Sequence, residues 1–133
     1  MSQRAVFVYG TLLPGESRWP HLAPFAVQVV QATAPGRLFD TGRGYPGARF
    51  TDGPVSIPGA WVRIAQDRWV SMLELLDGVE SEGTLYRRVE VLTTAGPAVS
   101  YEWMGDIEGL PELPSGWLAR PQPSLQNFTG EEQ

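Results

Sequence analysis

Two acidic residues near the end of an amphipathic segment are the strongest candidates for proton-transfer chemistry. Asp77 and Glu80 stand three positions apart, a spacing that places both carboxylates on one side of a helix end. The C-terminal end of a helix disfavours a negative charge, and burial against aromatic side chains raises the pKa of a carboxyl group. Glu80 therefore has the setting that a general acid/base needs near neutral pH. In the alternative interpretation, the acidic side chains here are solvated or pair with Arg87 and Arg88.

A second candidate is the run Tyr9, Gly10, Thr11 and Leu12, where an apolar segment ends in glycine and turns. Glycine allows the backbone to approach a ligand closely. The N–H groups that leave a sheet at such a point are unpaired donors suited to a carboxylate or a carbonyl oxygen. An ordinary glycine at a strand-to-turn junction would give the same pattern, so the run alone is a weak signal.

Aromatic residues form the third candidate group. It consists of Tyr45, Trp61, Tyr86, Tyr101, Trp103 and Trp117. In a small β-rich domain such residues pack mostly in the core or at its rim, so each has a structural interpretation beside a binding one.

Several classes of chemistry are excluded by residue types that the chain lacks. It has no Cys, one His (His21), and ten basic residues that are all Arg. Thiol nucleophiles, disulfide frameworks, P-loop or Schiff-base lysines and sites with several histidine ligands are therefore excluded. The net charge of -5 repels a nucleic-acid backbone on average, and we expect no nucleic-acid partner.

The elements that must position these residues are short. Fifteen Gly and twelve Pro in 133 residues are typical of a β-rich domain with many turns. The first strand should be central because it is continuously apolar, whereas Pro58 and Gly59 predict an edge or a bulge in the fourth. We expect strands at residues 5–9, 25–33, 37–40, 55–64, 86–93 and 97–104, with a short extended piece at 48–50 inside a turn-rich loop at 41–53.

Two helices are expected. Residues 19–22 read as a short helix with Pro20 in its first turn. Residues 67–79 carry apolar side chains at spacings of three and four, with Asp67 as the predicted N-cap. The apolar face of this second helix should pack on the sheet.

The length predicts one domain, at residues 1–120, followed by a C-terminal tail at 121–133 that we expect to be partly disordered. No apolar stretch approaches the roughly 20 residues that span a bilayer, and the N-terminus reads as a strand and not as a signal peptide. We therefore expect a cytoplasmic protein without a membrane partner.

The motifs, taken in order, resemble the gamma-glutamylcyclotransferase-like family. The resemblance implies an α+β fold, a small mixed β-barrel flanked by a few short helices, whose cavity holds a γ-glutamyl group. It implies Glu80 as the catalytic acid/base, the backbone of residues 9–12 as donors to the substrate, Tyr45, Tyr86 and Arg87 as pocket residues, and no metal or cofactor. The segments that carry it are residues 8–12, 36–40, 45–47, 76–80, 86–87 and 115–117.

One departure concerns the residue after the catalytic Glu, where the family usually has Gly. Ser81 follows Glu80 here, and the Glu-Gly pair occurs at Glu82 and Gly83. Glu82 is therefore a rival for the acid/base role. Glu80 is preferred because it alone keeps both the Leu-Asp-x-x-Glu spacing and the six-residue gap to Tyr86.

The residues leave two hypotheses for function. The leading one is a cyclotransferase that releases 5-oxoproline from a small-molecule γ-glutamyl compound. The alternative is a non-catalytic small-molecule-binding or interaction module of the same fold. The leaving group stays open among an amino acid, a polyamine, a lysine ε-amine and an antibiotic intermediate, and the protein is expected to be a monomer or a homodimer.

Overall fold

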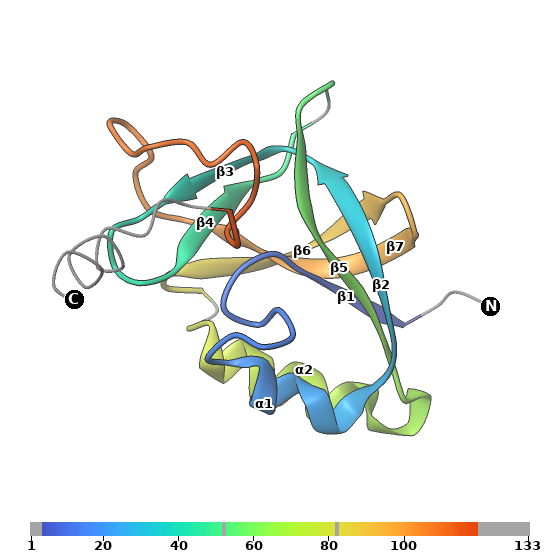
Figure 1. Cartoon of the computed structure of the whole chain (residues 1–133). Coiled ribbons are helices and arrows are strands. Elements are labelled where there is room, and N and C mark those ends of the chain that lie inside the picture. The colour runs from blue at the N-terminus through green and yellow to red at the C-terminus, as the bar shows by residue number, and fades with distance from the viewer. Residues whose placement is uncertain (1–3, 52, 82, 120–133) are drawn as a thin grey trace, which may run out of the picture.

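The computed structural model describes residues 4–51, 53–81 and 83–119. Within these residues, seven strands and two α-helices make up a mixed α+β fold (Figure 1). In chain order the elements are β1 Ala5–Val8, α1 Trp19–Leu22, the 3-10 turn η1 Ala23–Phe25, β2 Ala26–Pro35, β3 Arg37–Asp40, β4 Pro46–Arg49, β5 Ser56–Ile64, the 3-10 turn η2 Gln66–Arg68, α2 Trp69–Val79, β6 Tyr86–Thr93 and β7 Gly96–Trp103.

The main sheet has five strands in the order β2-β5-β1-β7-β6, and β3 pairs with β4 in a separate two-stranded sheet. β1 runs antiparallel to β5 and parallel to β7, so the sheet is mixed. Its two edges approach each other where the Thr94 N–H donates to the Thr33 carbonyl oxygen at 3.0 Å. The sheet does not close, so the expected barrel describes its curvature only loosely.

The central strand β1 supplies side chains to two cores, which confirms its predicted position. Val6 and Val8 face the cluster beneath the helices, whereas Ala5 and Phe7 face a second cluster under β3 and β4. Because successive residues of a strand point to opposite faces, a strand covered on both sides must be apolar throughout. All four β1 residues are buried.

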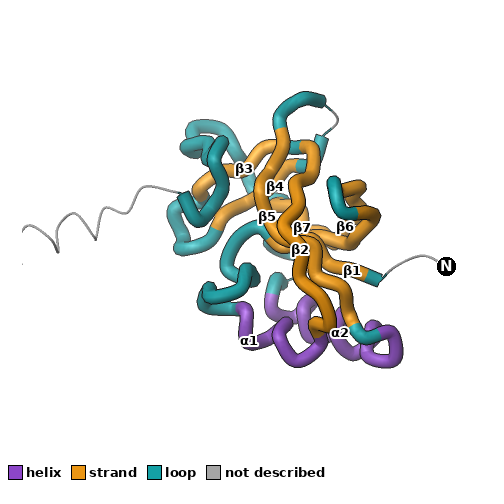
Figure 2. Tube along the Cα trace, turned by 45° about the vertical axis from the view of Figure 1, so that its right-hand side comes forward, coloured by secondary structure: helices purple, strands orange, loops and turns teal. Residues whose placement is uncertain are grey.

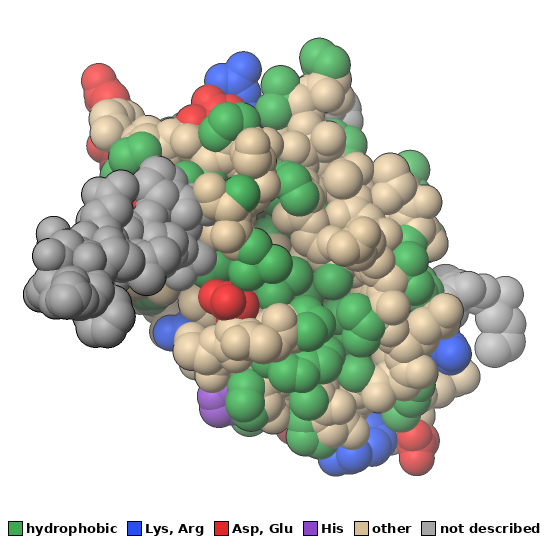
Figure 3. Space-filling view, viewed as in Figure 1, with side chains coloured by type: hydrophobic (Ala, Val, Ile, Leu, Met, Phe, Trp, Pro, Cys, Tyr) green, Lys and Arg blue, Asp and Glu red, His purple; other side chains and the backbone are tan. Residues whose placement is uncertain are grey.

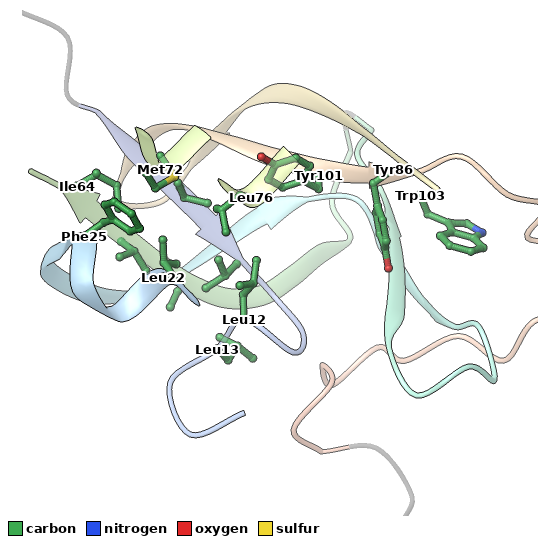
Figure 4. Packing of buried hydrophobic residues seen from close by; sticks show 14 residues of the cluster. Leu12, Leu13, Leu22, Phe25, Ile64, Met72, Leu76, Tyr86, Tyr101 and Trp103 are labelled. Atoms are coloured by element: carbon green, nitrogen blue, oxygen red, sulfur yellow. The ribbon is translucent and has the colours of Figure 1, made fainter. Parts of the chain in front are cut away.

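Both helices lie on one side of the main sheet (Figure 2). α2 buries Met72 and Leu76, and α1 buries Leu22. These side chains pack together in the first cluster, and Tyr86 and Trp103 lie at its far end (Figure 4). The apolar spacing in the sequence thus predicted the packed face of α2 correctly.

Two predicted details were wrong. Asp67 does not cap α2, because η2 precedes the helix and Arg68 occupies the N-cap position without a side-chain cap bond. β5 is not an edge strand, because it lies between β2 and β1. Pro58 is tolerated there because β1 pairs only with residues 60–63 of β5, so that Pro58 has β2 as its sole strand neighbour in the described sheet.

The turn-rich region between β3 and β5 contains a strand that the sequence indicated only in part. β4 begins at Pro46, two residues before the predicted extended piece, and pairs with β3 from Arg37↔Arg49 to Asp40↔Pro46. The segment after β7 packs back on this pair, since the Leu113 N–H donates to the Leu38 carbonyl oxygen at 2.7 Å. The predicted tail at 121–133 lies outside the described residues.

Trp103 fixes the distance between β4 and β7. A Cβ added to Gly47 would come within 2.5 Å of Trp103 Cγ and 2.7 Å of its Cβ, both close to the backbone of β7. Gly78, by contrast, has open space around its Cα within helix α2. The two glycines therefore respond to the same substitution in opposite ways.

Gly47→Ala should lower the free energy of unfolding by roughly 1–3 kcal/mol, because the tryptophan cannot retreat without moving β7. Gly78→Ala is the matched control and should raise it by roughly 0.5–1 kcal/mol. Urea denaturation of both variants and of the native protein measures the difference. Native-like stability of Gly47→Ala would contradict the described packing of Trp103.

Candidate active site

A small cavity opens where β1 ends, between β4, the end of α2 and the hairpin of β6 and β7. Its volume is about 20 Å³, enough for roughly one water molecule. Among the residues that line it are Phe7, Val8, Tyr9, Gly10, Thr11, Leu12, Tyr45, Pro46, Glu80, Tyr86, Ser100 and Tyr101.

Glu80 is the acidic residue of this lining. It follows the last residue of α2, and its N–H donates to the Leu76 carbonyl oxygen at 2.8 Å, which holds its backbone to the helix. The residue is only 7% exposed. Burial raises the pKa of the Glu80 carboxyl, and the nearby Arg18 guanidinium opposes that rise. A carboxyl group with a raised pKa suits proton transfer near neutral pH.

Arg18 is the charged partner of Glu80. Its Nη1 lies 3.3 Å from Glu80 Oε2, and its guanidinium carbon lies 5.6 Å from the centre of the Tyr45 ring. The backbone N–H of Arg18 donates to the Thr11 carbonyl oxygen at 2.8 Å. The turn after β1 therefore carries both the predicted backbone donors and this arginine.

The two tyrosine hydroxyls of the cavity are committed to backbone acceptors. Tyr9 donates to the carbonyl oxygen of Tyr101, and Tyr86 donates to that of Pro46. Burial raises the pKa of both phenols, and the Glu80 carboxylate raises it further. Both side chains thus stay neutral and brace the walls.

An aromatic cluster covers the outer side of the cavity. The Tyr86 and Trp103 rings lie edge to face at 5.3 Å, and Tyr45 lies 6.2 Å from Tyr86 and 6.1 Å from Trp103. Such rings exclude water, which strengthens electrostatic interactions inside the site.

Gly10 allows β1 and β4 to approach each other at the cavity. A Cβ at this position would lie 2.5 Å from Pro46 Cγ, so any larger residue would displace the proline that accepts the Tyr86 hydrogen bond. Among the described residues, none accepts a hydrogen bond from the N–H groups of Thr11 and Leu12. Both residues line the same cavity as Glu80, so their N–H groups are candidate donors to a ligand there.

Most of the residues predicted from sequence do meet in this cavity. The exception is Arg87, whose side chain is largely exposed and pairs with Glu102 at 2.6 Å. The expected placement of Arg87 in the pocket is therefore wrong, because neighbours on a strand face opposite ways and Tyr86 is the one that points inward. The residues brought together are Tyr9, Gly10, Thr11, Leu12, Tyr45, Glu80 and Tyr86.

Two of the acidic candidates have other placements. Asp77 accepts a hydrogen bond from the Tyr101 hydroxyl at 2.8 Å and pairs with Arg88 at 2.5 Å, so its carboxylate is held by two partners. Glu82, the rival for the acid/base role, lies outside the described residues.

Ser81 adopts the backbone conformation that the usual glycine would have in the loop after Glu80. Its φ angle is +53°, in the left-handed region that glycine occupies without strain. The position therefore requires a backbone conformation that favours Gly, and the serine adopts it at a modest cost.

Sequence reasoning missed Arg18 as a member of the site. Ser100 was missed too; its hydroxyl donates to the Phe7 carbonyl oxygen at 2.7 Å. No local pattern signals that Arg18 reaches a carboxylate 62 positions away. Only the fold of the turn after β1 brings the two together.

Larger depressions elsewhere differ from this cavity in their chemistry. Hydrophobic side chains gather in the middle of one face of the molecule (Figure 3). A groove of about 750 Å³ is lined there by residues that include Leu13, Val29, Pro58 and Trp117, and no ionisable side chain appears in its described lining. A second depression, of about 590 Å³, has Glu102 in its lining, but that carboxylate pairs with the largely exposed Arg87. The small cavity is the better candidate for an acid/base reaction because its carboxyl, Glu80, is buried and has a raised pKa.

No three His, Asp or Glu side chains come together as a metal-binding group among the described residues. No helix in the described part of the chain has the length and apolarity to cross a membrane.

Comparison with known proteins shows which sequences and structures this chain resembles. The family described as gamma-glutamyl cyclotransferase, AIG2-like, matches residues 6–119. A gamma-L-glutamyl-butirosin B gamma-glutamyl cyclotransferase of Niallia circulans is 28% identical over 100 residues. The match covers 74% of this chain and 63% of that relative, so this chain spans less than two thirds of the relative's length.

Solved structures share the fold. An uncharacterized protein of Pyrococcus horikoshii superposes with a TM-score of 0.68 at 21% identity, over 97% of this chain and 98% of the other. YkqA of Bacillus subtilis superposes with a TM-score of 0.65 at 23% identity, over 100% of this chain and 44% of the other. At these identities the likeness shows the fold alone.

Glu80→Gln tests the burial of the carboxyl without any substrate. The folded chain holds the Glu80 proton to higher pH than the unfolded chain, because burial raises its pKa. Between the two pKa values the folded state binds more protons, so the native free energy of unfolding falls as pH rises through that window. The amide of the variant has no such proton. The free energy of unfolding of the variant should therefore rise relative to that of the native protein as pH increases from the ordinary Glu pKa to the raised pKa of Glu80.

Urea denaturation of both proteins at a series of pH values measures this difference. A difference that does not change with pH, or that changes in the opposite direction, would mean that Glu80 is not a carboxyl with a raised pKa.

Proposed function

Because the chain belongs to the gamma-glutamyl cyclotransferase, AIG2-like family, we propose that it acts on γ-glutamyl amines or γ-glutamyl amino acids and releases 5-oxoproline. The observation that carries the proposal is the buried carboxylate of Glu80 in a cavity that Thr11 and Leu12 also line, two residues whose N–H groups have no acceptor among the described residues. An acid/base group and hydrogen-bond donors are what an intramolecular acyl transfer requires.

The reaction begins with a proton transfer to Glu80. The carboxylate accepts a proton from the substrate's α-ammonium group, which leaves a free amine with a nucleophilic lone pair. This amine attacks the γ-carbonyl carbon of the same molecule and closes a five-membered ring. Since both reacting groups belong to one molecule, the protein need only hold them in the reactive geometry.

The tetrahedral intermediate then breaks its bond to the leaving nitrogen. Two protons pass from the attacking nitrogen to the departing one over the whole reaction, and Glu80 is the group placed to carry them in succession. The products are 5-oxoproline and the free amine, so atoms and charges balance without an oxidant, a reductant or a cofactor.

The backbone at the end of β1 anchors the substrate in this proposal. The N–H groups of Thr11 and Leu12 donate to the α-carboxylate of the γ-glutamyl group, and the Gly10 position lets the chain approach closely. Tyr45 and Tyr86 form the walls that exclude water. Donation to the oxyanion that develops at the γ-carbonyl is the alternative role for the same N–H groups.

The name of the butirosin relative supports the substrate class. The gamma-L-glutamyl group of that protein's substrate is the part that this chain's cavity is proposed to bind, whereas the leaving amine is a separate matter. A cytoplasmic site of action with a small-molecule substrate, and without a nucleic-acid or membrane partner, completes the proposal.

Glu80→Gln should lower kcat/KM for 5-oxoproline release by about 10²–10⁴-fold, because it removes the group that moves the proton. The measurement is 5-oxoproline release from a panel of γ-glutamyl amines and amino acids. Glu102→Gln is the matched control, because Glu102 is also a shielded carboxylate paired with an arginine but does not line the cavity. It should keep activity within a few-fold of native.

Other outcomes assign the function differently. Equal release by native protein and Glu80→Gln would move the acid/base role towards Glu82. Binding of γ-glutamyl compounds without release from any of them would support the non-catalytic binding module.

A further inference from the structure

The cavity beside Glu80 is too small for a substrate, and its carboxylate is already paired. It measures about 20 Å³, far less than a γ-glutamyl group occupies. The carboxylate that must receive the substrate's ammonium already holds the Arg18 guanidinium at 3.3 Å. A substrate can therefore reach Glu80 only if one member of this pair moves.

Arg18 is the member that can move. Glu80 is held by its backbone hydrogen bond to Leu76 and has a side chain that is only 9% exposed. The Arg18 side chain is 33% exposed and starts from a turn outside the sheet. Its other guanidinium contact in the described structure is with the face of the Tyr45 ring, and such a contact is weak where the cation is partly exposed to water.

The charges of the pair complement the two charges of a γ-glutamyl head group. An α-ammonium and an α-carboxylate sit on one carbon atom, and the Glu80 carboxylate and the Arg18 guanidinium likewise lie side by side, 3.3 Å apart, at the cavity. When the substrate's ammonium pairs with Glu80, the Arg18 guanidinium loses its partner. The substrate's carboxylate is then next to that guanidinium and can replace Glu80 as its partner.

We propose that Arg18 is the residue that recognises the α-carboxylate: the substrate's ammonium displaces the guanidinium from Glu80, and the freed guanidinium pairs with the substrate's carboxylate. This inference rests on the proposed function and deepens it. The internal ion pair of the site is exchanged for two pairs with the substrate, so no charge is left unpaired in the buried region.

The position of Arg18 supports this exchange. Its backbone N–H bonds to the Thr11 carbonyl oxygen at 2.8 Å, so the guanidinium reaches out from the turn that also offers the Thr11 and Leu12 N–H groups. A carboxylate has two oxygens, and these can accept from the backbone donors on one side and from the guanidinium on the other.

The exchange makes the α-carboxylate a requirement for substrates. A 4-aminobutanoyl amide has the same attacking amine and the same carbonyl group, and cyclises to pyrrolidin-2-one, but it lacks the α-carboxylate. Such a compound can displace Arg18 from Glu80 but gives the guanidinium no new partner. The protein should therefore have a low kcat/KM for such a compound, and replacing Arg18 should change that value little.

The test compares γ-glutamyl and 4-aminobutanoyl amides of one amine as substrates for native protein, Arg18→Met, Arg18→Lys and Arg43→Met. Arg18→Met should lower kcat/KM for the γ-glutamyl compound by roughly ten- to a hundredfold, the usual effect of losing a hydrogen bond between charged groups. For the analogue the change should stay below about threefold. Arg18→Lys should recover part of the loss.

Arg43→Met is the matched control. Arg43 also lies over an aromatic ring of the cluster, 5.5 Å from the centre of Trp103, and does not line the cavity. It should affect both compounds alike. Because each variant is compared on two compounds, a loss of folded protein cancels from the ratio.

An equal loss on both compounds for Arg18→Met would overturn the proposal and assign Arg18 a role through Glu80 alone. Absence of lactam release by native protein would instead refute the proposed function. The same comparison is then made as dissociation constants by calorimetry. Tighter native binding of the γ-glutamyl compound that Arg18→Met abolishes would support carboxylate recognition, and equal binding of both compounds would overturn it.

Discussion

The burial of one carboxylate against the end of the central strand is the constraint on which the site depends. Glu80 continues from helix α2 into a region closed by aromatic rings, and it is 7% exposed. A buried carboxylate is costly unless it is paired, and removal from water raises its pKa. Arg18 pairs with Glu80 and offsets part of that cost. Burial still raises the pKa of the Glu80 carboxyl, and we propose that the substrate's ammonium can replace Arg18 as its partner.

Strand β1 positions the residues that line the cavity together with Glu80. This strand is buried on both faces by two separate cores, so its end is held rigidly. Two long-range hydrogen bonds join β1 and the residue after it to β7: the Ser100 hydroxyl donates to the Phe7 carbonyl oxygen, and the Tyr9 hydroxyl donates to the Tyr101 carbonyl oxygen. The N–H groups of Thr11 and Leu12, which have no acceptor among the described residues, follow this strand. In the proposed reaction they would be in place before the substrate binds, a preorganisation that stabilises the transition state.

The sequence predicted those parts of the structure that depend on the spacing of nearby apolar residues. Continuous apolarity placed β1 at the centre, and helical spacing found the packed face of α2. β4 was largely missed because Pro46 and Gly47 look like loop residues, and their strand conformation comes from pairing with β3. The inward and outward alternation of a strand could have separated Tyr86 from Arg87. Arg18 could not have been found, because its contact with Glu80 exists only in the folded chain.

The most direct test of this account is the titration of the Glu80 carboxyl itself. Carbon-13 NMR of protein labelled at the glutamate side-chain carboxyl, assigned by the signal lost in Glu80→Gln, follows one group through the pH range. The account predicts a pKa above that of ordinary glutamate in the free protein and a shift of the same signal when 5-oxoproline is added. An ordinary pKa with no response to 5-oxoproline would contradict the assignment of Glu80 as the acid/base.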